Sequence, residues 1–415
     1  MFLFFALAFG FCIVTVITSL KDGMAENVYF SAQEHYAGDL VFVGYTKTGE
    51  VSRHLDKRAV DTIFNTIRDE KIPVTRYTER TLYNDDTILF FNGNSVLLRY
   101  LNGVDWHNEE TYLNNLSYAS GGNKNLHDNS IILSDQVASV LGVQCGDNLI
   151  LELKNNSGQK NTGNFIVEAI FKDNTVFGFY KGFISKKTMN QLLGFSEEEC
   201  SSIGIFLPDR QSAEKYKTVL QKELSGKILS APLINSDAQF KDERDKRWNG
   251  IKIFILTIPV YISDIYKILD ALNLLSVFLY AMMLIIILVS ASVTFNLILH
   301  ERTKEIGTMR AIGFYEADIR HILICETFLL GTVSVIIGFF LSVFLTNLAG
   351  FISFAWFPSF DIFLKNGRLT AFFTPFNEAI NIIAVYFVLF LAVWFPVFRT
   401  SRAPLPEMLS GSMKG

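Results

Sequence analysis

The sequence contains few charged residues. Asp, Glu, Lys and Arg make up 19% of its 415 residues, whereas hydrophobic residues make up 50%. Soluble domains carry about a quarter charged residues, and disordered chains are less apolar than this one. The formal net charge of −4 leaves no basic excess to bind the phosphates of nucleic acids. These figures exclude disordered and nucleic-acid-binding proteins and favour a membrane protein.

Cysteine and proline are scarce as well. Four Cys residues are too few for a disulfide framework in a chain of this length. Nine Pro residues without a Gly-X-Y period exclude a collagen-like protein. Cys12 and Cys325 lie in or near apolar runs, so only Cys145 and Cys200 share the polar part of the chain. Whether these two form a disulfide is left open by their spacing.

Long runs without Asp, Glu, Lys or Arg predict the membrane-spanning segments. A helix rises ~1.5 Å per residue, so about 20 apolar residues cross a ~30 Å hydrocarbon core. The runs that reach this length are Met1–Leu20, Ala271–Leu299, Thr327–Phe360 and Ala379–Phe398. Ile253–Ser263 is too short to cross and contains Pro259, which favours a strand or an interfacial segment. The first run has no basic residues before it and no small-residue cleavage site after it, so we expect a retained anchor rather than a signal peptide.

Lys and Arg near the ends of spans prefer the cytoplasm, and their distribution predicts the orientation. They gather after the second run and in the tail, while the loop 360–378 holds only Lys365 and Arg368. Both termini are therefore predicted to be cytoplasmic. The predicted organisation is a first transmembrane helix (1–22), an extracytoplasmic or periplasmic α+β domain (23–270), a second helix (271–299), a cytoplasmic coupling helix (300–320), a third helix (321–350), an extracytoplasmic loop (351–378), a fourth helix (379–399) and a cytoplasmic tail (400–415).

Short alternating runs predict strands in the large domain, for example over 39–45, 87–91 and 95–100. A further unit combines the strand at 130–133 with a short helix capped by Ser134 and closed by Gly142. Its expected apolar face is Val137, Val140 and Leu141. Helices are also predicted over 183–193 and 210–224, with a strand at 202–207 between them. Strands interrupted by short helices predict an α+β fold.

The chain lacks the usual motifs of nucleotide, metal and hydrolase sites. The string closest to a P-loop, Gln221–Ile228, has neither the first glycine nor the final hydroxyl. The histidines show no H-E-x-x-H spacing, no Cys pair has metal spacing, and there is no G-x-S-x-G elbow. We therefore predict no catalytic residue, no metal site and no cofactor, although a triad assembled from distant residues is not excluded.

The stretch after the second apolar run has charges of alternating sign. Glu301, Lys304 and Glu305 are spaced to stabilise a helix, and Gly313 permits a turn. Two interpretations stay open, a short amphipathic helix that presents an apolar ridge to a cytoplasmic partner and a solvated loop. In the third span, small residues lie near one helical face, where another backbone could approach or lipid could lie: Gly331, Ser334, Gly338 and Ser342. Glu326 is expected at the cytoplasmic boundary or paired with a basic group such as Arg320.

Residues 301–313, ERTKEIGTMRAIG, resemble the segment after the second transmembrane helix of FtsX-type ABC permeases, the group that includes MacB and the LolC and LolE subunits. Glu326 stands where that family has an acidic residue, and residues 395–409 resemble its closing pattern. Residues 131–147 are similar to the MacB-type periplasmic core. The resemblance implies a multi-pass permease with four transmembrane helices. The residues it implies for ATPase coupling are Glu301, Arg302, Lys304, Glu305, Ile306, Gly307, Met309, Arg310 and Gly313.

What the family implies is a transport subunit in the bacterial inner membrane rather than an enzyme. Its expected partners are a cytoplasmic ABC ATPase dimer that binds ATP and Mg²⁺, a second permease subunit, identical or not, the lipid bilayer, and a periplasmic carrier or adaptor protein. The layout is closest to LolC and LolE, which release lipoproteins by mechanotransmission. A MacB-like exporter of peptides or drugs, an FtsX-like regulator of a cell-wall hydrolase, and a membrane-anchored receptor or enzyme stay open. Family members usually have a basic cytoplasmic segment before the first helix, whereas this sequence begins inside that helix. We expect either that translation starts further upstream or that this homologue lacks the segment.

Overall fold

The computed structural model describes residues 2–47, 52–83, 86–172, 180–354, 360–365 and 367–401. The chain divides into two units. Residues Met1–Asn27 and Ile268–Gly415 form one, here called the membrane unit, and residues Val28–Lys267 form the other, here called the sheet domain. Most of the expected C-terminal tail, from Arg402 onward, lies outside the described residues.

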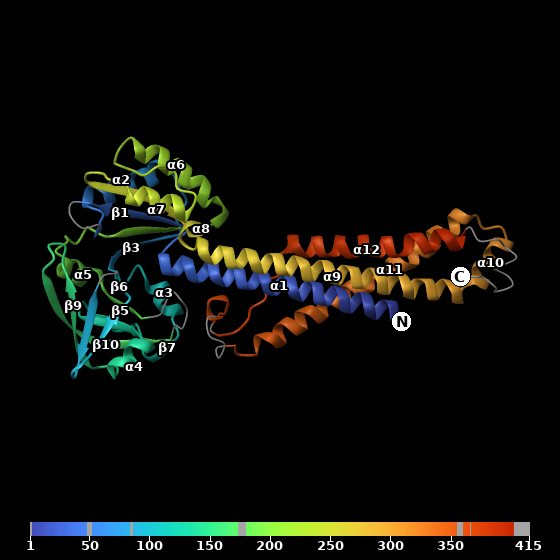
Figure 1. Cartoon of the computed structure of the whole chain (residues 1–415), viewed down its shortest axis with the longest axis horizontal. Helices are drawn as coiled ribbons and strands as arrows, with labels where there is room; N and C mark the ends of the chain where they lie inside the picture. The colour runs from blue at the N-terminus through green and yellow to red at the C-terminus, as the bar shows by residue number, and fades with distance from the viewer. Residues whose placement is uncertain are drawn as a thin grey trace. The chain divides into compact units, whose positions relative to one another are not determined.

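Four described helices are long and apolar enough to cross a membrane. They are α1 (Phe2–Tyr36), α9 (Ser263–Glu301), α11 (Glu316–Gly350) and α12 (Pro375–Ser401), and Figure 1 shows each as a long ribbon. A helix satisfies its own backbone hydrogen bonds in lipid, which is why charge-free runs adopt this structure. Four membrane helices with an α+β domain between the first two confirm the predicted fold class. The helices extend beyond the charge-free runs, so α1 reaches Tyr36 and α11 begins at Glu316.

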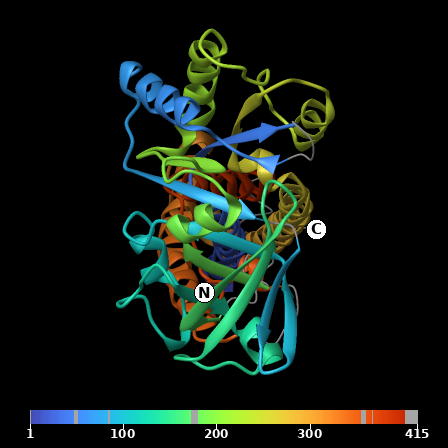
Figure 2. The same ribbon diagram turned by 90° about the vertical axis from the view of Figure 1, so that its left-hand side faces the viewer.

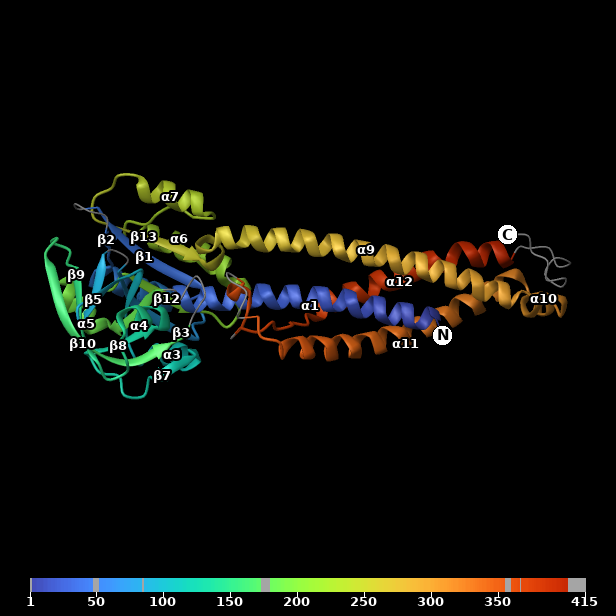
Figure 3. The same ribbon diagram turned by 60° about the horizontal axis from the view of Figure 1, so that its bottom comes forward.

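The helices of the membrane unit share one apolar core. Phe11 of α1, Phe295 of α9, Leu323 of α11 and Leu389 of α12 all contribute buried side chains to it. The small residues of α11 lie on its buried face: Gly331, Ser334, Gly338 and Ser342. A Cβ at Gly338 would lie 2.5 Å from the carbonyl oxygen of Ala8, so the backbone of α1 passes directly over this glycine. Figure 3 shows α11 alongside α1.

One mixed sheet of 13 described strands organises the sheet domain. Its order is β13-β1-β12-β3-β6-β11-β8-β10-β9-β4-β5, with β2 paired to β1 and β7 to β10. Only the β6–β11 and β8–β10 pairs among these are parallel. The strands are β1 (Leu40–Thr46), β2 (Ser52–Arg53), β3 (Arg76–Tyr83), β4 (Thr87–Phe91), β5 (Asn94–Leu98), β6 (Tyr100–Val104), β7 (Tyr118–Gly121), β8 (Ser130–Ser134), β9 (Asn148–Lys154), β10 (Lys160–Phe171), β11 (Lys181–Ser185), β12 (Ser202–Phe206) and β13 (Ile251–Thr257).

Helices cover the two ends of the sheet separately (Figure 2). At one end α2 and α6 pack on β1, β12 and β13. Towards the other end α4 packs on β5, β8 and β10, and α5 packs on β3, β6, β10 and β11. The helices of this domain are α2 (Lys57–Asp69), α3 (Glu110–Asn115), α4 (Asp135–Leu141), α5 (Lys186–Leu193), α6 (Ala213–Ser225), α7 (Asp237–Asp245) and α8 (Ile258–Tyr261), with a 3-10 turn at Arg210–Ser212.

Some local predictions for this domain are wrong. Ser134 stands at the N-cap of α4 but makes no bond to the backbone of the helix. Val140 is 49% exposed, because the short helix buries Val137, Ala138 and Leu141 instead. Residues 183–185 were expected to be helical but extend β11, which pairs with β6 and β8. The disulfide question, which the spacing left open, is answered by the structure, in which Cys145 and Cys200 are both free thiols.

Candidate functional site

The segment between α9 and α11 forms a short separate helix. α9 ends at Glu301, the backbone turns at Arg302, and α10 (Thr303–Ala311) follows. Hydrogen bonds continue across the turn, since the Arg302 amide donates to Ile298 O at 3.0 Å and the Ile306 amide donates to Arg302 O at 3.0 Å. Figure 3 shows α10 at the connection between the two long helices. The expected coupling helix at 300–320 therefore consists of α10 and the first turn of α11.

Buried residues of α10 hold it on the membrane unit. Thr303, Ile306 and Gly307 are buried, and Ile306 belongs to the core formed by the four long helices. Met309 packs against the same core. The expected apolar ridge of this helix therefore faces inward at these positions. Among the charged residues, Glu301, Lys304 and Glu305 are exposed.

The turn after α10 is held by the backbone. The Gly313 amide donates to Arg310 O at 3.1 Å and the Phe314 amide donates to Met309 O at 3.1 Å. Gly313 has a φ of 106°, which a residue with a side chain rarely adopts. On the far side, the Tyr315 amide donates to a carboxylate oxygen of Asp318 at 3.2 Å and starts α11. The path of the chain between the two helices is thus defined at both ends.

An exposed apolar surface lies on this turn and is here called the turn surface. It consists of Ile312, Phe314 and Tyr315, which are 74%, 45% and 78% exposed. The charge pattern did not single out Phe314 and Tyr315 as site residues. Their signal in the sequence is the run of large apolar residues on both sides of Gly313, where a solvated turn usually has polar residues.

An ion pair links the start of α10 to α11. Nη1 of Arg302 lies 2.7 and 2.8 Å from the two carboxylate oxygens of Glu326. The hydrogen bond and charge of Glu326 raise the pKa of Arg302 above its ordinary value. The expected partner, Arg320, instead lies over the ring of Phe398, with its guanidinium carbon 4.7 Å from the ring centre. Glu326 therefore pairs with a basic group, but that group comes from the preceding segment rather than from α11.

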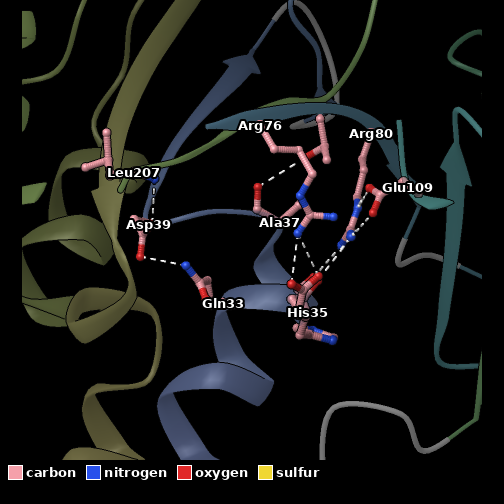
Figure 4. Close-up of polar contacts among 10 residues, drawn as sticks. Gln33, His35, Ala37, Asp39, Arg76, Arg80, Glu109 and Leu207 are labelled. Carbon is pink, nitrogen blue, oxygen red and sulfur yellow. Dashed lines mark hydrogen bonds and ion pairs between the residues drawn. The ribbon is translucent and has the colours of Figure 1, made fainter. Parts of the chain in front are cut away.

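A second polar cluster lies in the sheet domain, at the end of α1 (Figure 4). Arg80 and Glu109 form a bidentate ion pair in which both side chains are 1% exposed. The Arg80 guanidinium also donates to His35 O at 2.7 Å and to Glu34 O at 3.0 Å. Burial lowers the pKa of Arg80, but the charge and hydrogen bond of Glu109, together with Tyr112 and Glu34, raise it, so the net pKa lies above the ordinary value. The last carbonyls of α1, which have no partner within the helix, are thereby bound to β3.

Asp39 ties the residues after α1 to the sheet. One of its oxygens accepts from Gln33 Nε2 at 2.8 Å and the other accepts from the amide of Leu207 at 2.8 Å. Beside it, Ala37 O accepts from the hydroxyl of Thr78 at 3.1 Å. Sequence reasoning missed this whole cluster, because its partners come from positions far apart in the chain and belong to no known motif.

Comparison with known proteins identifies the membrane part. Residues 277–405 match the family model described as FtsX-like permease C-terminal. This part of the chain is therefore an FtsX-like permease C-terminal domain. The matched region begins in α9 and includes α10, the turn surface, α11 and α12. No curated protein matches the chain.

Two solved structures are similar to part of this chain. One is the periplasmic region of MacB from Actinobacillus actinomycetemcomitans, with 12% identity and a TM-score of 0.34, covering 56% of this chain and 95% of that one. The other is a domain of a putative permease protein from Porphyromonas gingivalis, with 12% identity and a TM-score of 0.29, covering 53% of this chain and 89% of that one.

Proposed function

We propose that this permease is the membrane subunit of an ABC transporter and that a separate ATPase docks on the turn surface. The observation that carries the proposal is an exposed apolar turn on a short helix whose other side is buried in the membrane unit. Exposed apolar residues grouped on one surface are typical of protein interaction sites. ATP and Mg²⁺ would be bound by that partner, as a dimer, and this chain would contribute no cofactor.

The contacts of α10 suggest how a movement of the ATPase would be transmitted. Ile306 is buried among side chains of the long helices, and Arg302 binds Glu326 of α11. A push on the turn surface would therefore displace α9 and α11 together rather than bend a loose loop. α1 and α9 both continue without a break into residues of the sheet domain. This continuity supports transmission through helices rather than passage of a solute through a pore.

The orientation is also part of the proposal. The turn surface and both termini lie in the cytoplasm and the sheet domain lies outside, in the periplasm of a bacterium with the chain in its inner membrane. The excess of Lys and Arg around α10 supports this placement. A reporter that fluoresces only in the cytoplasm, fused within 312–315, is expected to be bright. Fluorescence only from a fusion in the sheet domain contradicts the orientation.

For the cargo we propose lipoproteins, released from the inner membrane in the manner of LolC and LolE. The order of one helix, a large domain and three helices supports this choice through its likeness to those subunits. Such a complex contains two permease subunits, and a periplasmic carrier receives the cargo. In proteoliposomes with the co-purified ATPase, ATP is expected to release a lipid-modified protein into the supernatant. Failure of release, together with drug sensitivity or filamentation of depleted cells, favours a MacB-like or FtsX-like role instead.

The docking site can be tested by substitution on the turn surface. Phe314→Asp with Tyr315→Asp is expected to abolish co-purification of the ATPase, because two charges replace the apolar contact. Arg310→Glu with Gly313→Pro should abolish stimulation of ATP hydrolysis, since Pro cannot adopt the φ of 106° at Gly313. Leu97→Asp, at a side chain 55% exposed on β5, is the matched control and should have no effect. An ATPase that binds and is stimulated normally by both turn variants excludes this site.

A further inference from the structure

A cavity of about 890 Å³ lies in the membrane unit, where α11 ends and the chain returns towards α12. Its volume falls in the range of small-molecule sites, about 300–1,000 Å³. The wall from α11 and its end includes Asn347 and Phe351, and the wall from the returning chain includes Lys365, Arg368 and Phe373. The remaining lining residues are Thr346, Gly350, Leu369, Thr370 and Ala371.

The residues that line the cavity form a basic part and an apolar part. Lys365 and Arg368 bring two positive charges to the cavity, and no carboxylate is among its described lining residues. Phe351, Leu369 and Phe373 supply an apolar wall. A ligand that matches both parts has a negative head and an apolar body. Arg in particular binds phosphate oxygens in a bidentate way.

The two basic residues are held in place by their own backbone. The Lys365 amide donates to Arg368 O at 2.9 Å and the Arg368 amide donates to Lys365 O at 3.1 Å, so both side chains project from one tight turn. The returning chain is fixed to α1, because Asn27 Nδ2 donates to Phe363 O at 3.0 Å and the Phe372 amide donates to Ser19 O at 2.9 Å. The cavity is therefore largely preformed, which lowers the entropic cost of binding.

Exposed apolar side chains place this region at a membrane surface. Phe351, Ile352 and Phe376 are 76%, 53% and 72% exposed, and they lie just after α11 and in the first turn of α12. Apolar and aromatic side chains at the ends of membrane helices contact the boundary between acyl chains and head groups. Lys and Arg side chains near a membrane surface attract anionic lipid head groups through their charge.

We propose that the cavity binds one anionic phospholipid, with its phosphate on Lys365 and Arg368 and an acyl chain on Phe351, Leu369 and Phe373. The lipid would fill the space between the end of α11 and the returning chain and stabilise their arrangement. This site lies in the membrane unit apart from the turn surface, and it does not depend on which cargo the transporter moves. Failure of the ATPase experiments above would leave it unaffected.

The test uses the full chain, purified in detergent and stripped of lipid. Binding of fluorescent phosphatidylglycerol, phosphatidylcholine and inorganic phosphate is measured for the natural chain and for Lys365→Gln with Arg368→Gln. Phosphatidylglycerol is expected to bind the double variant at least about tenfold more weakly. A tenfold change corresponds to the loss of one charge-assisted hydrogen bond. Lys267→Gln with Arg68→Gln removes the same charges at exposed positions of the sheet domain and should bind as the natural chain does.

A second variant protects the test against misfolding. Ala371→Trp keeps both charges but fills the cavity, and it is expected to lose phosphatidylglycerol while eluting as a single species in gel filtration. The proposal is overturned if phosphatidylcholine binds as tightly as phosphatidylglycerol, or if inorganic phosphate competes as well as phosphatidylglycerol does. The site would then not be specific for an anionic lipid. Unchanged phosphatidylglycerol binding in either cavity variant overturns it as well.

Discussion

Arg302 at the start of α10 forms an ion pair with Glu326 of α11, in which the single nitrogen Nη1 lies 2.7 and 2.8 Å from the two carboxylate oxygens. The two residues are 24 positions apart. This pair, a second ion pair between Arg310 and Glu316 at 3.4 Å and the burial of Ile306 join α10 to the helix that follows it. The turn surface therefore follows a helix, α10, that is held in place by its contacts with α11 and with the core of the membrane unit.

The first prediction concerns that pair. Glu326→Arg and Arg302→Glu should each reduce the stimulation of the ATPase, because like charges then separate α10 from α11. The double exchange, Arg302→Glu with Glu326→Arg, should restore most of it. Because the two side chains are 43% and 42% exposed, the free energy of unfolding should change by less than about 1 kcal/mol in all three variants. Thermal unfolding measures this change. If the double exchange is no better than the single ones, the pair does not act as a link.

The second prediction concerns the ion pair at the end of α1. Arg80→Met leaves the Glu109 carboxylate buried without its cation and should lower the free energy of unfolding by about 3–5 kcal/mol. Arg80→Met with Glu109→Leu removes both charges and should be more stable than Arg80→Met alone. Urea unfolding of the full chain in detergent, followed by Trp fluorescence, measures both. Equal stability of the two variants would show that the pair contributes little.

The third prediction concerns the contact between α11 and α1. Gly338→Ala places a Cβ 2.5 Å from the backbone oxygen of Ala8, so the helices must move apart. We expect a loss of about 1–3 kcal/mol, the usual cost of overpacking. Gly350→Ala is the matched control, since its Cβ meets nothing closer than Leu369 O at 3.6 Å. A thermal unfolding curve of each variant in detergent distinguishes them, and equal midpoints would contradict close packing at Gly338.

The fourth prediction concerns the thiol of Cys200. Burial raises its pKa to about 12, so almost no thiolate exists at pH 8 and a maleimide should label Cys200 only after denaturation. The raised pKa favours the protonated form in the folded state. Its contribution to stability is therefore complete below about pH 9 and is lost as the pH rises towards 12. Mass spectrometry of the labelled peptides is the measurement, with the half-exposed Cys145 as the internal control. Rapid labelling of native Cys200 would contradict its burial.

Much of the fold follows from local pattern. Charge-free runs predict the membrane helices because a lipid environment accepts few charges and demands internal hydrogen bonds. Alternation predicts strands such as β1 and β4 because successive side chains point to opposite faces. The motif at 301–313 predicts the coupling segment because it resembles a family, and not because its residues show which side faces a partner.

The sequence by itself therefore determined the number of membrane helices, the α+β character of the domain between them and the place of the segment that joins α9 to α11. Only the tertiary structure decided that Ile306 faces the core while Phe314 and Tyr315 face outward, that Glu326 pairs with Arg302, and that Arg80 binds the end of α1. The physical reason is that periodicity and charge act over a few neighbouring residues. A partner 24 or 45 positions away is brought close only by packing.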